Sequence, residues 1–399
     1  MPSEFPHYDA LMSAGAFVPD QDQADNMFQA ALEESFSYHY ENCPAFANYC
    51  YNRGFKPERV TSDLADLPFV PVQAFKHFGR DLLITQTSEE KTFFMNSSAT
   101  SGQPSSISVS RRTAKRQAIS MAQVISSFLT PKKRPFIIFD IKPKSSASGN
   151  VGARHGATVG FMSLSSQAHF VLEEDENGGI FLNSEALKEA LQKVKETGQA
   201  PVIFGFTYVI FDVLNQLDTT NPLAQFDAGT ILHIGGWKKL EAQKASKERF
   251  NKIVSERFGL KPNDVIDVYG FTEQMGINYP SFDLDDKIAP NFVRVLVRDP
   301  DTMQALPAGQ EGLLQFISPL PLSYPGISVL TDDLGVITNS FGELRSRWGT
   351  TFRVTGRAKN AEVRGCGDIM SSYLARAKDQ NIPSDLKLLI PRLLFHEKS

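Results

Sequence analysis

Short, nearly uninterrupted apolar runs that end at glycine-containing turns recur through the middle of this 399-residue chain. They lie at 134–143, 200–214, 229–236 and 264–273. Each run has the length and composition of a strand that is buried on both faces. Helical segments closed by a glycine lie between them, at 184–198 and 238–259. This alternation predicts an α/β protein, a class in which ligands bind where strands end in turns.

The two ends of the chain have a different pattern. Residues 21–52 predict an amphipathic helix that is broken at Pro44, and Pro68 and Pro71 predict an extended segment. From residue 291 onward the pattern predicts β-hairpins. The expected division is a large body over 1–352 and a small carboxyl-terminal lid or tail over 353–399.

Charge and composition exclude several classes of protein. Lys plus Arg number 41 and Asp plus Glu number 45, so the net charge is −4 and no basic face is available for nucleic acid. No stretch reaches the 18 apolar residues of a membrane span, and the first residues lack the order of a signal peptide. We therefore expect a cytoplasmic protein. The three cysteines, an odd number, argue against a disulfide framework.

The segment 95–105, MNSSATSGQPS, concentrates hydroxyl groups and backbone N–H donors in one turn. Its donors include those of Ser98, Thr100, Ser101 and Gly102. A loop of this kind can wrap a polyphosphate. It is not a Walker A loop, because the Gly-Lys-Ser/Thr ending is missing. On composition alone, a serine-rich surface loop is the more common explanation.

Two further segments follow predicted strands. In YGFTE, Tyr269 offers a ring that can stack on a base, and Glu273 a carboxylate that can hold Mg²⁺. Gly235 and Gly236 end the preceding strand and permit close approach of the backbone to a ligand. Taken alone, each segment is also explained as a strand and its cap.

The carboxyl-terminal third adds an acidic segment and a cysteine. Asp332 and Asp333, in LTDDLG, predict a turn whose carboxylates can accept hydrogen bonds from ribose hydroxyls. Arg357 follows a glycine, and Arg364 precedes Cys366 by two residues. Neighbouring cations favour thiolate over thiol and so favour a reactive cysteine. The alternative is a buried, inert cysteine.

The order of these segments resembles that of the adenylate-forming superfamily of acyl-CoA synthetases, adenylation domains and luciferases. SSATSGQPS resembles the phosphate loop of that family, YGFTE its Tyr-Gly-x-Thr-Glu motif, LTDDLG its ribose motif and GRAKNAEVRG its hinge motif. PFVPVQAFK, GFTYVIFDVL, HIGGWKK and VRGC look more narrowly like the LuxE-type acyl-protein synthetases, distant relatives of phenylacetate-CoA ligases. This resemblance covers about 24–367.

The resemblance implies a fold and an activity. The fold is a large amino-terminal domain of mixed β-sheets flanked by helices, with a short, truncated carboxyl-terminal lid. The activity is that of an AMP-forming ligase that uses ATP and Mg²⁺ to turn a carboxylic acid, such as a fatty acid, into an acyl-adenylate. The acyl group then passes to the enzyme's own cysteine as a thioester, and from there to a partner such as an acyl reductase.

The same resemblance assigns roles to individual residues. It implies that the ATP phosphates are bound by Ser98, Thr100, Ser101 and Gly102, and that the adenine and the acyl-adenylate are contacted by Tyr269, Gly270 and Thr272. It also implies that Glu273 binds Mg²⁺, Asp333 binds the ribose, Arg357 lies at the hinge and Cys366 accepts the acyl group. Gly235 and Gly236 join the nucleotide-binding set because glycines admit a close ligand.

The chain also departs from the superfamily. Ser105 stands where many members carry a lysine after the loop proline, so Arg111 and Arg112 are candidates for the missing charge. Few residues follow the hinge, and Lys378 and Lys387 are the candidates for the usual carboxyl-terminal lysine.

Two alternatives to the self-acylating enzyme stay open at this point. In the first, the acyl group passes to coenzyme A or to a carrier protein, and Cys366 is structural. In the second, the chain is a non-catalytic nucleotide-binding partner of a reductase. The particular acid, the pathway and the oligomeric state do not follow from the sequence.

Overall fold

The computed structural model describes residues 3–60, 63–86, 92–97, 103–129, 132–143, 150–176, 179–217, 221–236, 246–282 and 285–358. Its α-helices are α1 (Pro6–Ser13), α2 (Gln21–Asn42), α3 (Pro44–Asn52), α4 (Val72–Phe78), α5 (Arg111–Leu129), α6 (Ala153–Met162), α7 (Ser184–Glu196), α8 (Thr207–Gln216) and α9 (Lys247–Glu256). Short 3₁₀ turns are η1 (Pro57–Arg59), η2 (Leu64–Asp66), η4 (Pro262–Asp264) and η5 (Thr272–Gln274). None of these helices is long and apolar enough to cross a membrane.

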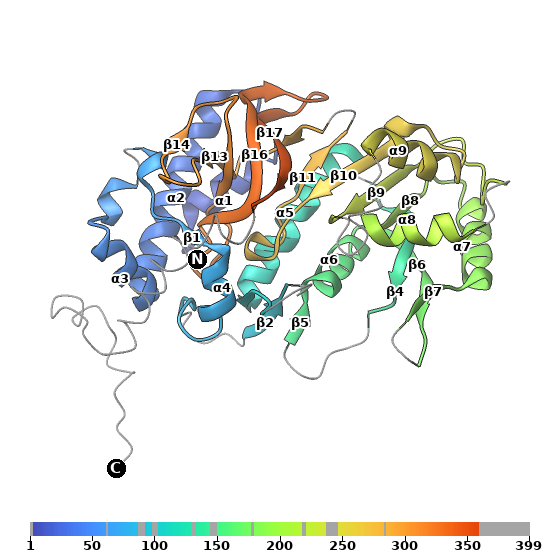
Figure 1. Ribbon diagram of the computed structural model, residues 1–399, viewed down its shortest axis with the longest axis horizontal. Helices are drawn as coiled ribbons and strands as arrows, with labels where there is room; N and C mark the ends of the chain where they lie inside the picture. The colour runs from blue at the N-terminus through green and yellow to red at the C-terminus, as the bar shows by residue number, and fades with distance from the viewer. Residues whose placement is uncertain are drawn as a thin grey trace, which may run out of the picture.

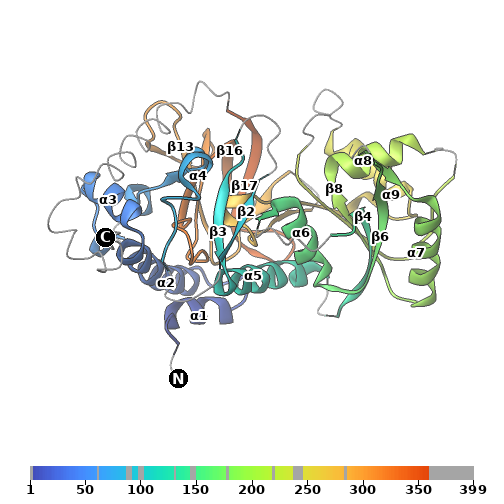
Figure 2. The same cartoon turned by 90° about the horizontal axis from the view of Figure 1, so that it is seen from below.

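The strands are β1 (Val70–Pro71), β2 (Thr92–Asn96), β3 (Ser106–Ser110), β4 (Arg134–Ile141), β5 (Asn150–Gly152), β6 (Ser165–Glu174), β7 (Ile180–Leu182), β8 (Val202–Phe206), β9 (Thr230–Ile234), β10 (Val265–Tyr269), β11 (Tyr279–Ser281), β12 (Lys287–Ile288), β13 (Arg294–Arg298), β14 (Ala305–Leu306), β15 (Glu311–Ile317), β16 (Ser328–Glu343) and β17 (Trp348–Arg357). They form three sheets, and Figures 1 and 2 show the two larger ones on opposite sides of the molecule with α5 and α6 between them.

Sheet C has the strand order β11-β10-β9-β8-β4-β6-β7, with helices α7 to α9 packed around it (Figure 1). Its inner strands run parallel, so the carboxyl ends of β4, β8, β9 and β10 lie along one edge. Every residue of β8 is buried, as expected for a strand covered on both faces. The α/β class predicted from the sequence is confirmed.

Sheet A has the order β12-β17-β16-β15-β13-β14, and β1 pairs in parallel with β16. These are the hairpins predicted from residue 291 onward. Sheet B is small, with the order β3-β2-β5. The broken amino-terminal helix is also confirmed, because α2 ends at Asn42 and α3 begins at Pro44.

Side-chain caps begin several of the helices. The Asp20 carboxylate accepts a hydrogen bond from the Gln23 amide at the start of α2, at 2.9 Å. Asn183 does the same for α7, and Ser246 for α9. A cap of this type satisfies a backbone donor that the helix leaves unpaired and stabilises it by about 1 kcal/mol.

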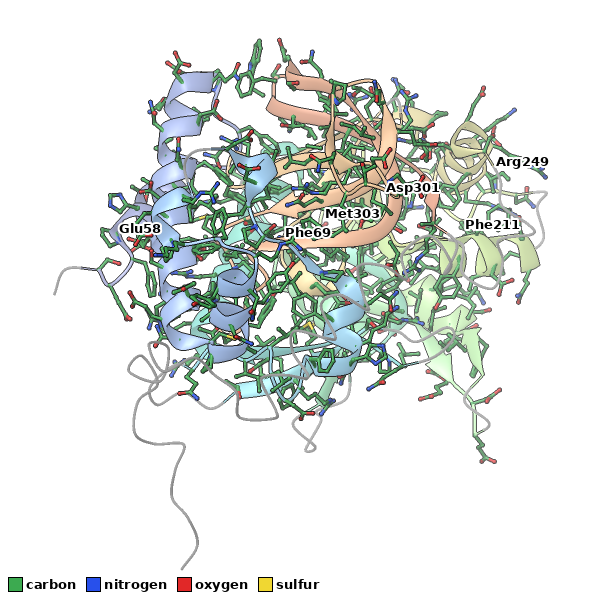
Figure 3. The ribbon with its side chains drawn as sticks, turned by 60° about the vertical axis from the view of Figure 1, so that its left-hand side comes forward. Glu58, Phe69, Phe211, Arg249, Asp301 and Met303 are labelled. Carbon is green, nitrogen blue, oxygen red and sulfur yellow. The ribbon has the colours of Figure 1, made fainter. Side chains whose placement is uncertain are left out.

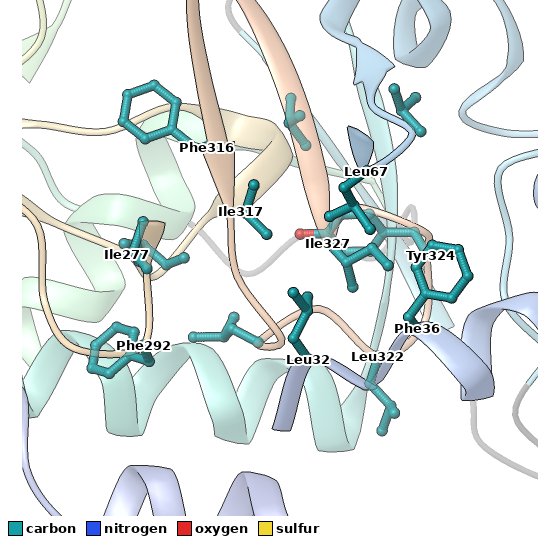
Figure 4. Close-up of a cluster of buried hydrophobic side chains, with 14 of the residues drawn as sticks. Leu32, Phe36, Leu67, Ile277, Phe292, Phe316, Ile317, Leu322, Tyr324 and Ile327 are labelled. Carbon is teal, nitrogen blue, oxygen red and sulfur yellow. The ribbon is translucent and has the colours of Figure 1, made fainter. Parts of the chain in front are cut away.

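The largest hydrophobic cluster joins α2 to sheet A. Figure 4 shows Leu32 and Phe36 of α2 facing Ile317 of β15 and Tyr324 of the following segment. All four side chains are almost completely removed from water. At about 2 kcal/mol for each large apolar side chain, this contact anchors the amino-terminal helices to the sheet.

A smaller cluster holds the segment before α4 against the same sheet. Phe69 packs with Leu313, Leu330 and Ala358, and Met303 covers the cluster from outside (Figure 3). Because Val70 and Pro71 then pair with β16, the position of α4 relative to β16 is fixed.

Two predicted elements are wrong in detail. The run 200–214 is not one strand: β8 ends at Phe206 and α8 begins at Thr207, and the apolar residues of α8 follow a helical spacing that the unbroken run conceals. In the predicted helix 238–259, α9 begins only at Lys247, and 237–245 lie outside the described residues. The extended segment predicted at Pro68 and Pro71 is confirmed, because Val70 and Pro71 form β1 and Pro71 is extended, with ψ 146°, directly before α4.

The predicted turn at Asp332 and Asp333 is also wrong, because both residues lie inside β16. Leu330 pairs with Gln315 and Leu334 with Leu313, so four steps along β16 match two along β15. The two aspartates therefore sit in a bulge, which turns side chains out of the regular alternation of a strand.

Candidate adenylation site

The end of β10 brings the YGFTE segment to the carboxyl edge of sheet C. Tyr269 is the last residue of β10, and Thr272 and Glu273 belong to η5 directly after it. The Tyr269 hydroxyl donates a hydrogen bond to Asp333 Oδ2 at 2.6 Å. Its ring packs against that of Phe316 with the centroids 5.9 Å apart. Residues 64 positions apart in the sequence are thus joined by one short hydrogen bond.

Glu273 lies at the centre of this region and is only 4% exposed. Burial raises the pKa of its carboxyl group, although a hydrogen bond with the Ser105 side chain lowers it. The nearby Asp332 carboxylate raises this pKa further and the charge of Lys76 lowers it. A buried carboxylate in this situation is one that a divalent cation would stabilise in its ionised form.

Ser105 also closes the base of the predicted phosphate loop. The Ser97 amide donates to the Ser105 carbonyl, and the Ser105 amide donates to Ser97 Oγ, both at 2.9 Å. The predicted loop ligands Ser98, Thr100, Ser101 and Gly102 lie outside the described residues. The two residues that close the loop nevertheless bring its base to Glu273.

The bulge of β16 carries the two aspartates to the same place. Asp333 contacts Tyr269, as above, and Arg357 Nε lies 3.9 Å from Asp333 Oδ1. Burial raises the pKa of the Asp333 carboxyl, and the Tyr269 hydroxyl and Arg357 oppose the rise. The Arg357 side chain is 66% exposed, so its ion pairs contribute little stability. It remains accessible from solvent beside the site.

Gly235 and Gly236 follow β9, the strand that pairs with β10. Gly235 has φ +88°, a conformation that glycine adopts without strain. The Thr207 hydroxyl holds this turn by donating to the Gly235 carbonyl at 2.5 Å, and it also lies 2.9 Å from His233 Nδ1. Burial lowers the pKa of His233 to about 4, so this imidazole is neutral at neutral pH.

Two residues of α4 that the sequence analysis did not assign to the site meet Asp332. Gln73 Nε2 donates to Asp332 Oδ2 at 2.8 Å, and Lys76 Nζ lies 3.8 Å from the same oxygen. Arg357 approaches it as well, at 3.6 Å. The other oxygen, Asp332 Oδ1, is buried without a hydrogen-bond partner among the described residues. Both residues belong to the PFVPVQAFK segment, which carries part of the family resemblance but was given no role in the site.

The candidate residues therefore divide into two groups. The structure brings together those of the body, namely Gly235, Gly236, Tyr269, Gly270, Thr272, Glu273, Asp333 and Arg357. Cys366, Lys378 and Lys387 lie outside the described residues, as does the predicted lid beyond residue 358. A separate cavity of about 530 Å³ lies between α2 and sheet A, and none of the candidate residues lines it.

Comparison with known families agrees with this arrangement. The family model described as "Acyl-protein synthetase, LuxE" matches residues 3–375. The chain belongs to the LuxE family of acyl-protein synthetases. The match covers more than nine-tenths of the sequence, including the segment that contains Cys366.

Two bacterial ligases are also similar to this chain over most of its length. It is 26% identical over 356 residues to the long-chain-fatty-acid–luciferin-component ligase of Vibrio harveyi, covering 87% of this chain and 88% of the relative. The ligase of the same name from Aliivibrio fischeri is 22% identical over 351 residues, covering 86% and 88%.

Solved structures show the same fold. An open conformation of 2-hydroxyisobutyryl-CoA ligase, crystallised with 2-HIB-AMP and CoA, matches with a TM-score of 0.63 at 16% identity, over 86% of this chain and 76% of the other. The same ligase in the postadenylation state gives 0.63 over 86% and 69%. The predicted adenylate-forming fold of the body is confirmed.

Proposed function

We propose that this LuxE-family protein uses ATP to activate a long-chain fatty acid and transfers the acyl group to its own Cys366. The observation that carries the proposal is the convergence of Tyr269, Glu273 and Asp333 at the base of the donor-rich loop. The fatty acid is proposed from the names of the two bacterial relatives.

In the first step, a carboxylate oxygen of the acid attacks the α-phosphorus of ATP. The new P–O bond forms as the bond to the bridging oxygen breaks, and pyrophosphate leaves. Donors that already point at the developing charge lower the barrier, because they need not reorganise. We expect the loop and the helical turn η5 to provide such donors, and Asp333 to accept hydrogen bonds from the ribose hydroxyls.

Mg²⁺ fits the carboxylate of Glu273. No group of three His, Cys, Asp or Glu side chains forms a metal site in the described part of the chain. An ion here would therefore rest on Glu273 and on phosphate oxygens, which is the usual arrangement for Mg²⁺. When bound, the ion supplies positive charge to the phosphates. The buried carboxyl group of Glu273 would hold the ion in place.

In the second step, the thiolate of Cys366 attacks the acyl carbon. The thiol proton has already passed to solvent when the thiolate forms; the C–S bond then forms, the bond between the acyl carbon and the AMP oxygen breaks, and AMP leaves. Splitting the transfer in this way replaces one difficult step by two easier ones. The thioester would then pass to an acyl acceptor, for which we propose a reductase.

The two other cysteines do not compete for this role. Cys43 and Cys50 are fully buried. Burial raises the pKa of Cys43 to about 12 and that of Cys50 well above its ordinary value. Both stay protonated at neutral pH, and a protonated thiol is not a nucleophile.

Intact-protein mass spectrometry tests the proposal. Wild type and Cys366→Ser are incubated with ATP, Mg²⁺ and fatty acids of several chain lengths. We expect a hydroxylamine-labile mass increase that requires ATP, matches the acid and is absent from Cys366→Ser. An adduct that persists in this variant overturns the thiol assignment. AMP release that needs coenzyme A, with no adduct, identifies a soluble acceptor instead.

A further inference from the structure

The predicted phosphate loop lacks a lysine at Ser105, and the two arginines considered as replacements do not lie at the loop. Arg112 pairs with Glu4 at 2.9 Å and covers the ring of Phe5. Arg111 begins α5 at the far end of β3, whose five residues extend about 17 Å from Ser105 at ~3.4 Å per residue. The charge for a polyphosphate must come from another element.

Helix α4 touches the base of the loop. It ends at Phe78, and a Cβ atom placed on the next residue, Gly79, would lie 1.9 Å from the carbonyl oxygen of Ser106, the residue after Ser105. The end of α4 is therefore packed against the backbone at the start of β3, next to Ser105. Lys76 lies one turn earlier on this helix, and Figure 1 shows α4 beside β2 and below sheet A.

The ammonium group of Lys76 is near the site without being locked in place. It is 3.8 Å from Asp332 Oδ2, close to the limit for an ion pair, and its side chain is 25% exposed. Gln73 already donates to the same oxygen at 2.8 Å. If Lys76 turned toward another anion, Asp332 would keep a hydrogen-bond donor. Arg80, further along, is held by Asn96 at 2.8 Å.

We propose that Lys76 is the cation that contacts the polyphosphate of ATP in this protein and takes the part of the lysine missing at Ser105. The inference rests on the proposed function, because it places ATP in this site. Two contacts support it: α4 packs against the backbone at the base of the loop, and Lys76 lies beside Asp332. The charge of Lys76 also lowers the pKa of the Glu273 carboxyl group.

The test compares binding of ATP and AMP by calorimetry in the wild type, Lys76→Met, Lys76→Arg and Gln73→Leu. AMP lacks the pyrophosphate portion, so a cation on that portion acts on ATP alone. We expect Lys76→Met to weaken ATP binding by about 10- to 100-fold, the value of one charge-assisted hydrogen bond, and to leave AMP binding unchanged. Lys76→Arg should restore most of the loss.

Gln73→Leu is the matched control, since it removes the shorter contact to Asp332 without changing charge. If Lys76 only orients Asp332, Gln73→Leu will weaken ATP binding as much as Lys76→Met, and the proposal is overturned. Equal loss for ATP and AMP in Lys76→Met overturns it too. A wild type that binds ATP but forms no acyl-adenylate refutes the proposed function only, whereas a wild type that binds no ATP refutes both.

Discussion

Glu273 keeps a carboxyl group inside the protein, where ionisation is unfavourable. Its pKa is raised above the ordinary 4.5, mainly by burial. The folded state therefore holds its proton at pH values where the unfolded chain has released it, so Glu273 lowers stability as pH rises above about 4.5. We expect Glu273→Gln to melt at a higher temperature than the wild type at pH 8, with a gap that shrinks toward pH 4, and to be inactive. Thermal denaturation across this range measures the gap.

Glu189 provides the control, since it is exposed and a hydrogen bond from Lys193 lowers its pKa. Glu189→Gln should give no such gain at pH 8. A Glu273→Gln variant that is less stable than the wild type at pH 8, or a gap that does not vary with pH, contradicts the account. A gain in stability in Glu273→Gln alone would show that the Glu273 carboxylate destabilises the fold, as expected of a residue retained for binding and not for stability.

At the scale of single residues, the sequence predicted the site residues that belong to short motifs. It did not predict the residues that reach the site only through contacts between distant segments. Tyr269 and Asp333 are found from local patterns, and the structure joins them directly. Gln73 meets Asp332 across 259 positions, and nothing in the pattern around either residue indicates the contact. Such pairs depend on how β1 and α4 dock on β16, which is a tertiary property.

At the scale of elements, an apolar run that forms a single strand was predictable, whereas a run that contains both a strand and a helix was not. The segments that became β4, β9 and β10 have strand-length apolar runs with glycine or proline at their ends. The run 200–214 hides a junction between β8 and α8, because both elements are buried and equally apolar. The aspartates of β16 favour a turn locally, but pairing with β15 and β17 on both sides overrides this preference.

The junction between α4 and β3 gives the prediction at this scale. A side chain at Gly79 would collide with backbone atoms, including the Phe75 carbonyl at 2.5 Å, and backbone cannot rotate away. We expect Gly79→Ala to lower the free energy of unfolding by about 1–3 kcal/mol, as overpacking does. Gly152→Ala is the control, because its Cβ meets no atom within 4 Å and its φ is −70°. Urea denaturation measures both. Equal stability of the two variants would refute the close packing of α4.

The whole molecule contains two halves whose cores are largely separate, and each buries a neutral histidine. His39, on α2, lies 2.6 Å from Thr85 Oγ1 and 3.0 Å from the Pro321 carbonyl. His233 lies in sheet C, beside Thr207. The family resemblance carried by the order of motifs predicted a body of mixed β-sheets flanked by helices, but not its division into two cores. The environment of each histidine did not follow from the sequence, because burial depends on the packing of distant elements.

These histidines predict how stability depends on pH. Burial lowers the pKa of His39 to about 3 and that of His233 to about 4, against 6.5 ordinarily. Below pH 6.5 the unfolded chain binds protons that the folded state refuses, so stability falls as pH drops toward 4 and then 3. Each histidine adds up to about 1.4 kcal/mol per pH unit to the slope of unfolding free energy against pH.

His39→Gln and His233→Gln should each flatten the slope of unfolding free energy between pH 6 and pH 4.5, whatever stability they lose at pH 7. Because the two residues belong to different halves, the double variant should flatten it by the sum. Denaturant titrations at several pH values measure these slopes, and a single variant with the wild-type slope would show that its histidine is already protonated in the fold.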